Sequence, residues 1–141
     1  MKGRVLVVAG SDSGGGAGIQ ADIKTITALD GFAMTAVTAL TAQNSVSVAN
    51  IFKTPPAFVA EQIRVTLEDL GADAVKTGMM ADAPIIEAAA DALDALASAI
   101  PWVIDPVMVS TARDRLLDED AAQSLKTRLI SRARVVTPNM A

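Results

Sequence analysis

The chain alternates short apolar runs with longer amphipathic stretches, and glycine or proline marks most of the boundaries between them. The apolar run at 4–9 is continuous and ends in Gly10, which is typical of a strand buried on both faces. The run at 46–52 lies between polar breaks and predicts a peripheral strand. Further strands are predicted at 34–40, 72–77, 102–104 and 134–136.

Amphipathic helices are predicted between these strands. A glycine-rich turn at 10–18 leads into the first helix, which ends near Gly31. Thr54 is the expected N-cap of the second helix, and Asp82 is the expected N-cap of the Ala-rich third helix. A fourth amphipathic helix is predicted at 119–132.

Strands separated by helices of this length predict right-handed βαβ units. The expected fold class is therefore α/β, with a doubly wound, mostly parallel sheet and helices on both faces. In such a sheet, ligands bind beyond the carboxyl ends of the strands. Glycine and polar residues follow the predicted strand ends here, at Gly10–Gly16, Gln43-Asn44, Gly78-Met79, Asp105-Pro106 and Asn139.

Length and composition narrow the function classes. The 141 residues are enough for one domain, and 16 acidic against 12 basic residues argue against nucleic-acid binding. The absence of His and Cys excludes thiol nucleophiles, Ser-His-Asp triads and most zinc sites. No apolar stretch reaches the roughly 18 residues of a membrane helix. The run at 4–9 is also too short for a secretory signal, so no membrane partner and a cytoplasmic location are expected.

The glycine-rich turn has a functional and a structural interpretation. Such a turn lets a ligand approach backbone N–H groups at a helix N-terminus, where the dipole favours anions or electron-rich atoms. Residues 16–21 fit the G-x-G-x-x-A dinucleotide fingerprint formally, but the second strand lacks the acidic residue that would bind a ribose. A P-loop is excluded because no Gly-Lys-Ser/Thr follows the glycines. The number of glycines favours ligand approach over a merely flexible turn.

The other candidates are ambiguous when each is taken alone. Gln43 fits the edge of a heterocycle, and it also fits a turn cap. Met79 fits the core or the wall of a planar ligand. Asp105 fits a Mg²⁺ ligand or a turn, and Asp22 fits a cap or a pair with Lys24 as well as a substrate contact.

Taken together, these segments resemble the hydroxymethylpyrimidine/phosphomethylpyrimidine kinase family of the ribokinase-like superfamily. The resemblance spans the chain in the family's order, and the SGGGAGIQAD and DPVM blocks are its specific motifs. Its segments are Ala9–Thr25, Val37–Ser45, Lys76–Met80, Val103–Ser110 and Val136–Met140.

The resemblance implies ATP- and Mg²⁺-dependent phosphorylation of 4-amino-5-hydroxymethyl-2-methylpyrimidine, then of its monophosphate, in thiamine biosynthesis. It implies a homodimer and an aminopyrimidine substrate whose edge bonds to Gln43. Asp105 would bind the metal ion, and Lys76 and Asn139 would bind the phosphates of ATP. The other residues that would line the substrate pocket are Gly10, Ala17, Asp22, Met79 and Val107.

The sequence departs from the family in two places. Ala112-Arg113-Asp114 replaces a Ser-Gly-Asp turn, so Asp114 is carried over only weakly. The family continues past Ala141 with a metal-linked Glu, an anion hole and the catalytic residue. We therefore expect residues 1–141 to form the N-terminal, substrate-binding portion of one kinase domain, without catalytic activity of its own. A half-sheet would leave apolar surface exposed and favour association.

Two alternatives to this function stay open. The chain can act on a related hydroxymethyl heterocycle, as pyridoxal kinase does. It can also be a non-catalytic pyrimidine-binding or remnant module.

Overall fold

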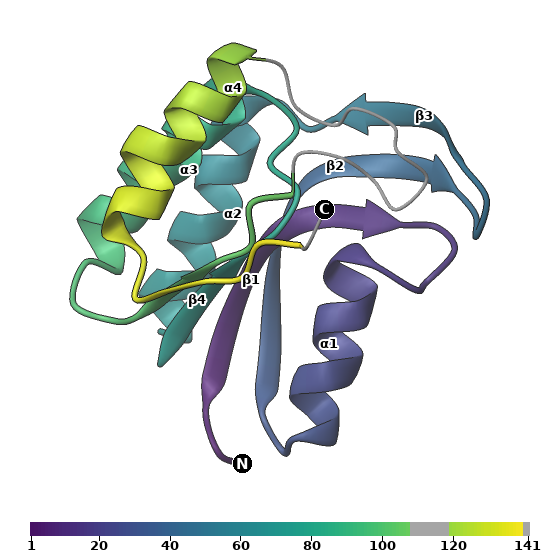
Figure 1. Ribbon diagram of the computed structural model, residues 1–141. Coiled ribbons are helices and arrows are strands. Elements are labelled where there is room, and N and C mark those ends of the chain that lie inside the picture. The colour runs from purple at the N-terminus through teal and green to yellow at the C-terminus, as the bar shows by residue number, and fades with distance from the viewer. Residues whose placement is uncertain (108–118, 140–141) are drawn as a thin grey trace.

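The computed structural model describes residues 1–107 and 119–139, which form one six-stranded sheet between helices (Figure 1). The strand order is β3-β2-β1-β4-β5-β6. Only β3 is antiparallel to its neighbour in this sheet. The strands are β1 (Arg4–Asp12), β2 (Phe32–Gln43), β3 (Val48–Lys53), β4 (Ala74–Thr77), β5 (Trp102–Ile104) and β6 (Val135–Val136).

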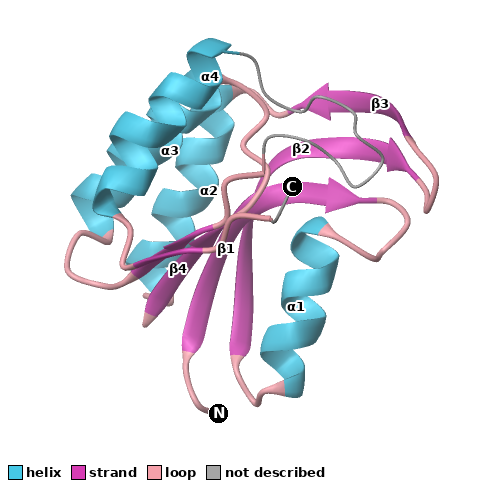
Figure 2. Cartoon of the chain, viewed as in Figure 1, coloured by secondary structure: helices cyan, strands magenta, loops and turns pink. Residues whose placement is uncertain are grey.

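The helices cover both faces of the sheet, as Figure 2 shows. One face carries α1 (Gly18–Ala28). The other carries α2 (Pro56–Asp69), α3 (Ala83–Leu96) and α4 (Glu119–Ser124). The last of these continues through a π-helical turn, η1 (Leu125–Leu129), and a 3-10 turn, η2 (Ile130–Arg132). The predicted α/β class, the mostly parallel sheet and the two helical layers are confirmed.

The central strand β1 explains the two layers, because its successive side chains point to opposite faces. Val7 and Ala9 are fully buried in a small cluster under α1. Leu6 and Val8 are fully buried in the large core cluster on the other face. The continuous apolar run at 4–9 thus supplies both cores, as a strand buried on both faces requires.

The two predicted helix N-caps have different outcomes in the structure. The Asp82 side chain accepts a hydrogen bond from the Ile85 N–H at 3.0 Å, so the predicted cap of α3 is confirmed. The predicted Thr54 cap is wrong, because α2 begins at Pro56 after an extended Pro55 and has no side-chain cap. The Thr54 N–H instead donates to the Thr38 carbonyl at 3.0 Å, which keeps this residue bonded to β2.

Strands β1 and β2 run further than the apolar pattern predicted, to Asp12 and Gln43. The extension of β2 pairs with β3 in an antiparallel hairpin, in which Leu40 lies opposite Phe52. Backbone pairing therefore carries these strand ends past the buried segment. Among the described residues, no helix is long and apolar enough to cross a lipid bilayer.

Candidate functional site

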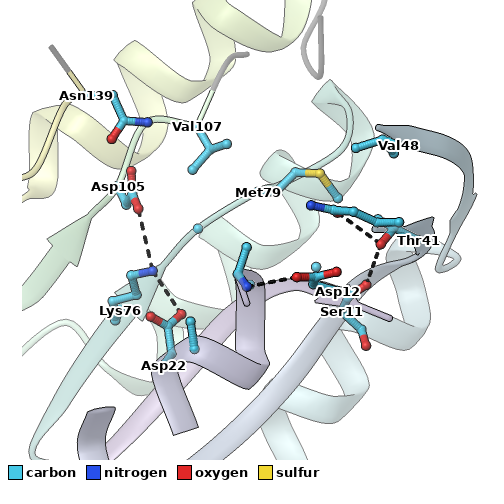
Figure 3. Close-up of a pocket in the computed structure, with 16 residues that line it drawn as sticks. Ser11, Asp12, Asp22, Thr41, Val48, Lys76, Met79, Asp105, Val107 and Asn139 are labelled. Atoms are coloured by element: carbon cyan, nitrogen blue, oxygen red, sulfur yellow. Dashed lines mark hydrogen bonds and ion pairs between the residues drawn. The ribbon is translucent and has the colours of Figure 1, made fainter. Parts of the chain in front are cut away.

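A pocket of about 280 Å³ lies where the carboxyl ends of the parallel strands meet (Figure 3). Its walls come from the ends of β1, β2 and β4, from the start of β3, from α1, and from the segments that follow β4, β5 and β6. All nine residues that the sequence singled out line this one pocket; they are Gly10, Ala17, Asp22, Gln43, Lys76, Met79, Asp105, Val107 and Asn139. The structure brings them together, and their individual roles stay predictions.

Close backbone approach shapes one end of the pocket. A Cβ at Gly10 would lie 2.6 Å from Met79 Cε, so glycine is the residue that lets this methionine lie against β1. The Thr38 hydroxyl donates to the Met79 carbonyl at 2.6 Å and fixes the backbone there. Met79 is 8% exposed and belongs to the core cluster while it lines the pocket. Met79 is therefore a core residue, and its contact with a planar ligand stays a prediction.

The side chains of Gln43 and Asn44 have different surroundings in the structure. The Asn44 side chain accepts the N–H groups of Val46 and Ser47 at 2.8 and 3.0 Å, so it caps the turn. Gln43 lines the pocket, and its Oε1 accepts the Thr41 hydroxyl at 3.2 Å. Among the described residues the Gln43 amide nitrogen has no acceptor, and it remains a donor for a ligand.

The other end of the pocket is charged. Lys76 Nζ lies 2.9 Å from Asp22 Oδ2 and 3.6 Å from Asp105 Oδ2, with all three side chains about a fifth to a quarter exposed. The suggested pairing of Asp22 with Lys24 is wrong. Lys24 instead donates to the Gly15 carbonyl at 2.7 Å, because it points along α1 toward the glycine-rich turn.

The surroundings of Asp105 shift the pKa of its carboxyl group upward. Burial raises its pKa above the ordinary value, the Lys76 ammonium lowers the pKa, and the nearby Asp22 raises it again. Its Oδ1 is buried and has no hydrogen-bond partner among the described residues. An unpartnered buried oxygen of this kind is suited to a cation or to a donor on a ligand.

Several further residues line the pocket to which the sequence assigned no individual role, and Asp12 is the most important of them. Asp12 is 6% exposed, and its carboxylate accepts backbone N–H groups of the glycine-rich turn. An Asp two residues before a Gly run is a signature of an Asx-type turn and could have identified it. The others are Ser11, Gly18, Ala21, Thr41, Val48 and Gly78. Asp114 and its neighbours Ala112 and Arg113 lie outside the described residues.

The donor set at the charged end fits Mg²⁺. No group of three or more acidic side chains converges within residues 1–107 and 119–139. Mg²⁺ commonly binds through one or two carboxylates and completes its shell with water and substrate phosphates. The unpartnered Asp105 Oδ1 is suited to this kind of site.

Comparisons with known proteins agree with this geometry. A protein-family model described as phosphomethylpyrimidine kinase matches residues 12–141. The hydroxymethylpyrimidine/phosphomethylpyrimidine kinase of Mycobacterium leprae is 49% identical over 137 residues, which are 97% of this chain and 49% of that protein. The chain thus spans about half the length of the kinases that it matches.

Solved structures show the same relation. A phosphomethylpyrimidine kinase from Clostridium difficile is 39% identical with a TM-score of 0.89, and the match covers 96% of this chain and 58% of that one. Pyridoxal kinase from Staphylococcus aureus, solved with AMP-PCP and pyridoxal, is 35% identical with a TM-score of 0.81, covering 96% and 48%. The fold is therefore the ribokinase-like fold. On its sequence match and its structure, the chain belongs to the phosphomethylpyrimidine kinase family.

Proposed function

We propose that the chain binds 4-amino-5-hydroxymethyl-2-methylpyrimidine for ATP-dependent phosphorylation of its hydroxymethyl group, and then of the monophosphate, in thiamine biosynthesis. One observation carries the proposal. A single pocket combines a small apolar end, where the Gln43 amide nitrogen has no acceptor among the described residues, with a charged end built around Lys76. A neutral heterocycle with a hydroxymethyl arm needs these two environments side by side.

At the apolar end, the ring lies between Met79 and the glycine-rich turn, with Ala17 and Val107 beside it. Gln43 bonds to the ring edge. Holding a reactant in one orientation is the main contribution that side chains make to phosphoryl transfer. These residues therefore serve to aim the hydroxymethyl oxygen toward the charged end.

At the charged end, Lys76 and Asn139 bind phosphate oxygens, and Asp105 holds Mg²⁺ through its unpartnered oxygen. Mg²⁺, when bound, neutralises negative charge on the transferred phosphoryl group. Lys76 also forms ion pairs with both Asp22 and Asp105. The chain's own contribution at this end is thus an ordered set of charges.

We infer that these 141 residues are the substrate-binding portion of one kinase domain, since the related kinases are about twice as long. The nucleotide surface and the group that activates the hydroxyl then come from the remaining portion. The chain by itself is expected to release no ADP. A homodimer and a cytoplasmic location, where ATP is available, complete the proposal.

Isothermal titration tests the binding half of this proposal directly. The unmodified chain should bind the pyrimidine alcohol, and Gln43→Leu should weaken binding about tenfold through loss of one hydrogen bond in the pocket. Gln123→Leu, on the exposed surface of α4, is the matched control and should bind normally. The absence of heat with the unmodified chain would refute the proposal.

Pyridoxal serves as the competing ligand in the same experiment, because a pyridoxal kinase shares this fold. Tighter binding of pyridoxal than of the pyrimidine would favour the second candidate function. In the absence of Mg²⁺, the neutral alcohol should bind more tightly than its monophosphate, since three carboxylates and one ammonium line the described pocket.

A further inference from the structure

The turn between β1 and α1 wraps around the carboxylate of Asp12. Its Oδ1 accepts the Gly14 N–H at 2.7 Å. Its Oδ2 accepts the N–H groups of Gly16 and Ala17 at 2.9 and 2.8 Å. The Asp12 carbonyl accepts the Gly15 N–H at 3.0 Å. The amides that a glycine-rich turn offers to a phosphate in other proteins are therefore already bonded within this chain.

Packing leaves this arrangement no spare room. Asp12 is 6% exposed, although it lines the pocket. A Cβ at Gly14 would lie 3.1 Å from Asp12 Oδ1 and 3.3 Å from the Gln43 carbonyl oxygen. From the helix side, Lys24 Nζ donates to the Gly15 carbonyl at 2.7 Å. The carboxylate thus sets the path of the turn, and the residues that follow the turn line the pocket.

The charged side chains of the pocket lie in two separate places. Figure 3 shows Asp12 on one side and Lys76 with Asp105 on the other. Asp12 places a negative charge at the start of α1, where the helix dipole stabilises it. Lys76 is the single cationic side chain among the described residues that line the pocket. A phosphate beside Asp12 would meet a like charge, and the Gly14, Gly16 and Ala17 N–H groups there already bond to the carboxylate, whereas beside Lys76 it would meet an ammonium.

We propose that Asp12 is a positioning and specificity-determining residue. Its carboxylate takes the place of a bound anion at the N-terminus of α1 and reserves this end of the pocket for an uncharged ring. The identity of the ring rests on the proposed function. The role of the carboxylate does not, because it follows from the bonds within the turn.

Chemical rescue tests this role. Asp12→Ala leaves three N–H groups around a space the size of a carboxylate, and formate is the probe that fits it. Asp12→Asn is the second variant. It fills the space but turns an NH₂ group toward donors, so formate has nowhere to bind. Asp69→Ala, which removes an exposed carboxylate at the end of α2, is the control, and sodium chloride at equal ionic strength is the control salt.

Thermal melting and titration with the pyrimidine alcohol give the readouts. We expect Asp12→Ala to lose about tenfold or more in pyrimidine affinity, because buried donors are left unpaired. Formate should raise its melting temperature and restore most of the affinity. Asp12→Asn should bind weakly with or without formate. The unmodified chain and Asp69→Ala should not respond to formate.

Three results would overturn the proposal. Asp12→Ala could bind the pyrimidine as tightly as the unmodified chain. It could bind weakly and fail to respond to formate. Or it could be unfolded both with and without formate, whereas recovery of a cooperative melt by formate alone would support the role. If the unmodified chain does not bind the pyrimidine, the proposed function fails, and the formate-dependent melt still tests Asp12.

Discussion

Replacing Lys76 with methionine tests the electrostatics of the charged end most directly. The substitution keeps the length and the apolar stem of the side chain and removes the ammonium from between Asp22 and Asp105, at 2.9 and 3.6 Å. At an effective dielectric constant of ~20, each contact is a gross attraction of roughly 5 kcal/mol. Desolvation of the ammonium offsets most of this attraction.

The exposed fractions of the three side chains set limits on the net loss in the free energy of unfolding. They are 23%, 19% and 25% for Lys76, Asp22 and Asp105. Removing one partner of a fully buried pair costs about 3–5 kcal/mol, and exposed pairs contribute about 0–1 kcal/mol. Side chains that are mostly buried fall between these limits. We expect Lys76→Met to lower the free energy of unfolding by about 2 kcal/mol at neutral pH.

The loss of stability caused by Lys76→Met should be smaller at low pH than at neutral pH. Burial raises the pKa of Asp105 in the folded state, so its contribution to stability is greatest below the ordinary value and is lost as the pH rises through the raised value. Without the Lys76 ammonium, which lowers the pKa of Asp105, that value rises further. The destabilisation by Lys76→Met should therefore shrink as the pH falls through the raised pKa and Asp105 becomes neutral.

Urea unfolding followed by tryptophan fluorescence measures both effects, because Trp102 is the only tryptophan of the chain and is 2% exposed. Lys126→Met, on the exposed side of η1, is the control and should change little. Adding Asp105→Asn to Lys76→Met should recover part of the loss by removing the unpaired charge. A loss below about 0.5 kcal/mol, the range of an ordinary surface substitution, or a loss independent of pH, would refute the reasoning.

Three further substitutions test single contacts. Gly10→Ala should push Met79 Cε, which would be 2.6 Å from the new Cβ, into the pocket; pyrimidine affinity measured by titration should fall with little change in melting temperature, and an unchanged affinity would contradict this. Thr38→Val removes the donor to the Met79 carbonyl and should cost about 1–2 kcal/mol in urea unfolding, with Thr38→Ser recovering most of it. Asp82→Ala removes the acceptor for the Ile85 N–H and should cost about 1 kcal/mol, whereas Asp82→Asn, a comparable cap, should cost less; equal losses would argue against capping.

The residues of the pocket could be predicted from the sequence because the sheet topology brings the ends of the strands together. Parallel strands end at one edge of a sheet, so Gly10, Gln43, Met79 and Asp105 had to meet once the strands were recognised. The boundaries were less predictable. Thr54 matches the preferred type of N-cap residue, yet its N–H pairs with β2, and strand pairing decided its conformation.

Side-chain partners were the least predictable feature, because they depend on which elements pack together. Asp22 has a nearby candidate in Lys24, but its partner is Lys76, which is 54 residues away and on β4. Strand order places β4 beside β1, and the side chain of Lys76 emerges on the face that α1 covers. No local pattern contains this information.

The glycine-rich turn shows why the sequence alone leaves the chemistry of such a turn open. A Gly-rich strand-to-helix turn offers N–H groups to an anion, and the sequence cannot show whether that anion is a ligand or a side chain. Here Asp12 supplies it. On the proposed function, phosphate would then bind near Lys76, whose ammonium already pairs with Asp22 and Asp105. One shared ammonium is too little positive charge for the phosphates of ATP and of a phosphorylated substrate. On the proposed function, the balance would come from a divalent cation at Asp105 and from groups outside the described pocket, so that phosphate binding, unlike ring binding, would depend on them.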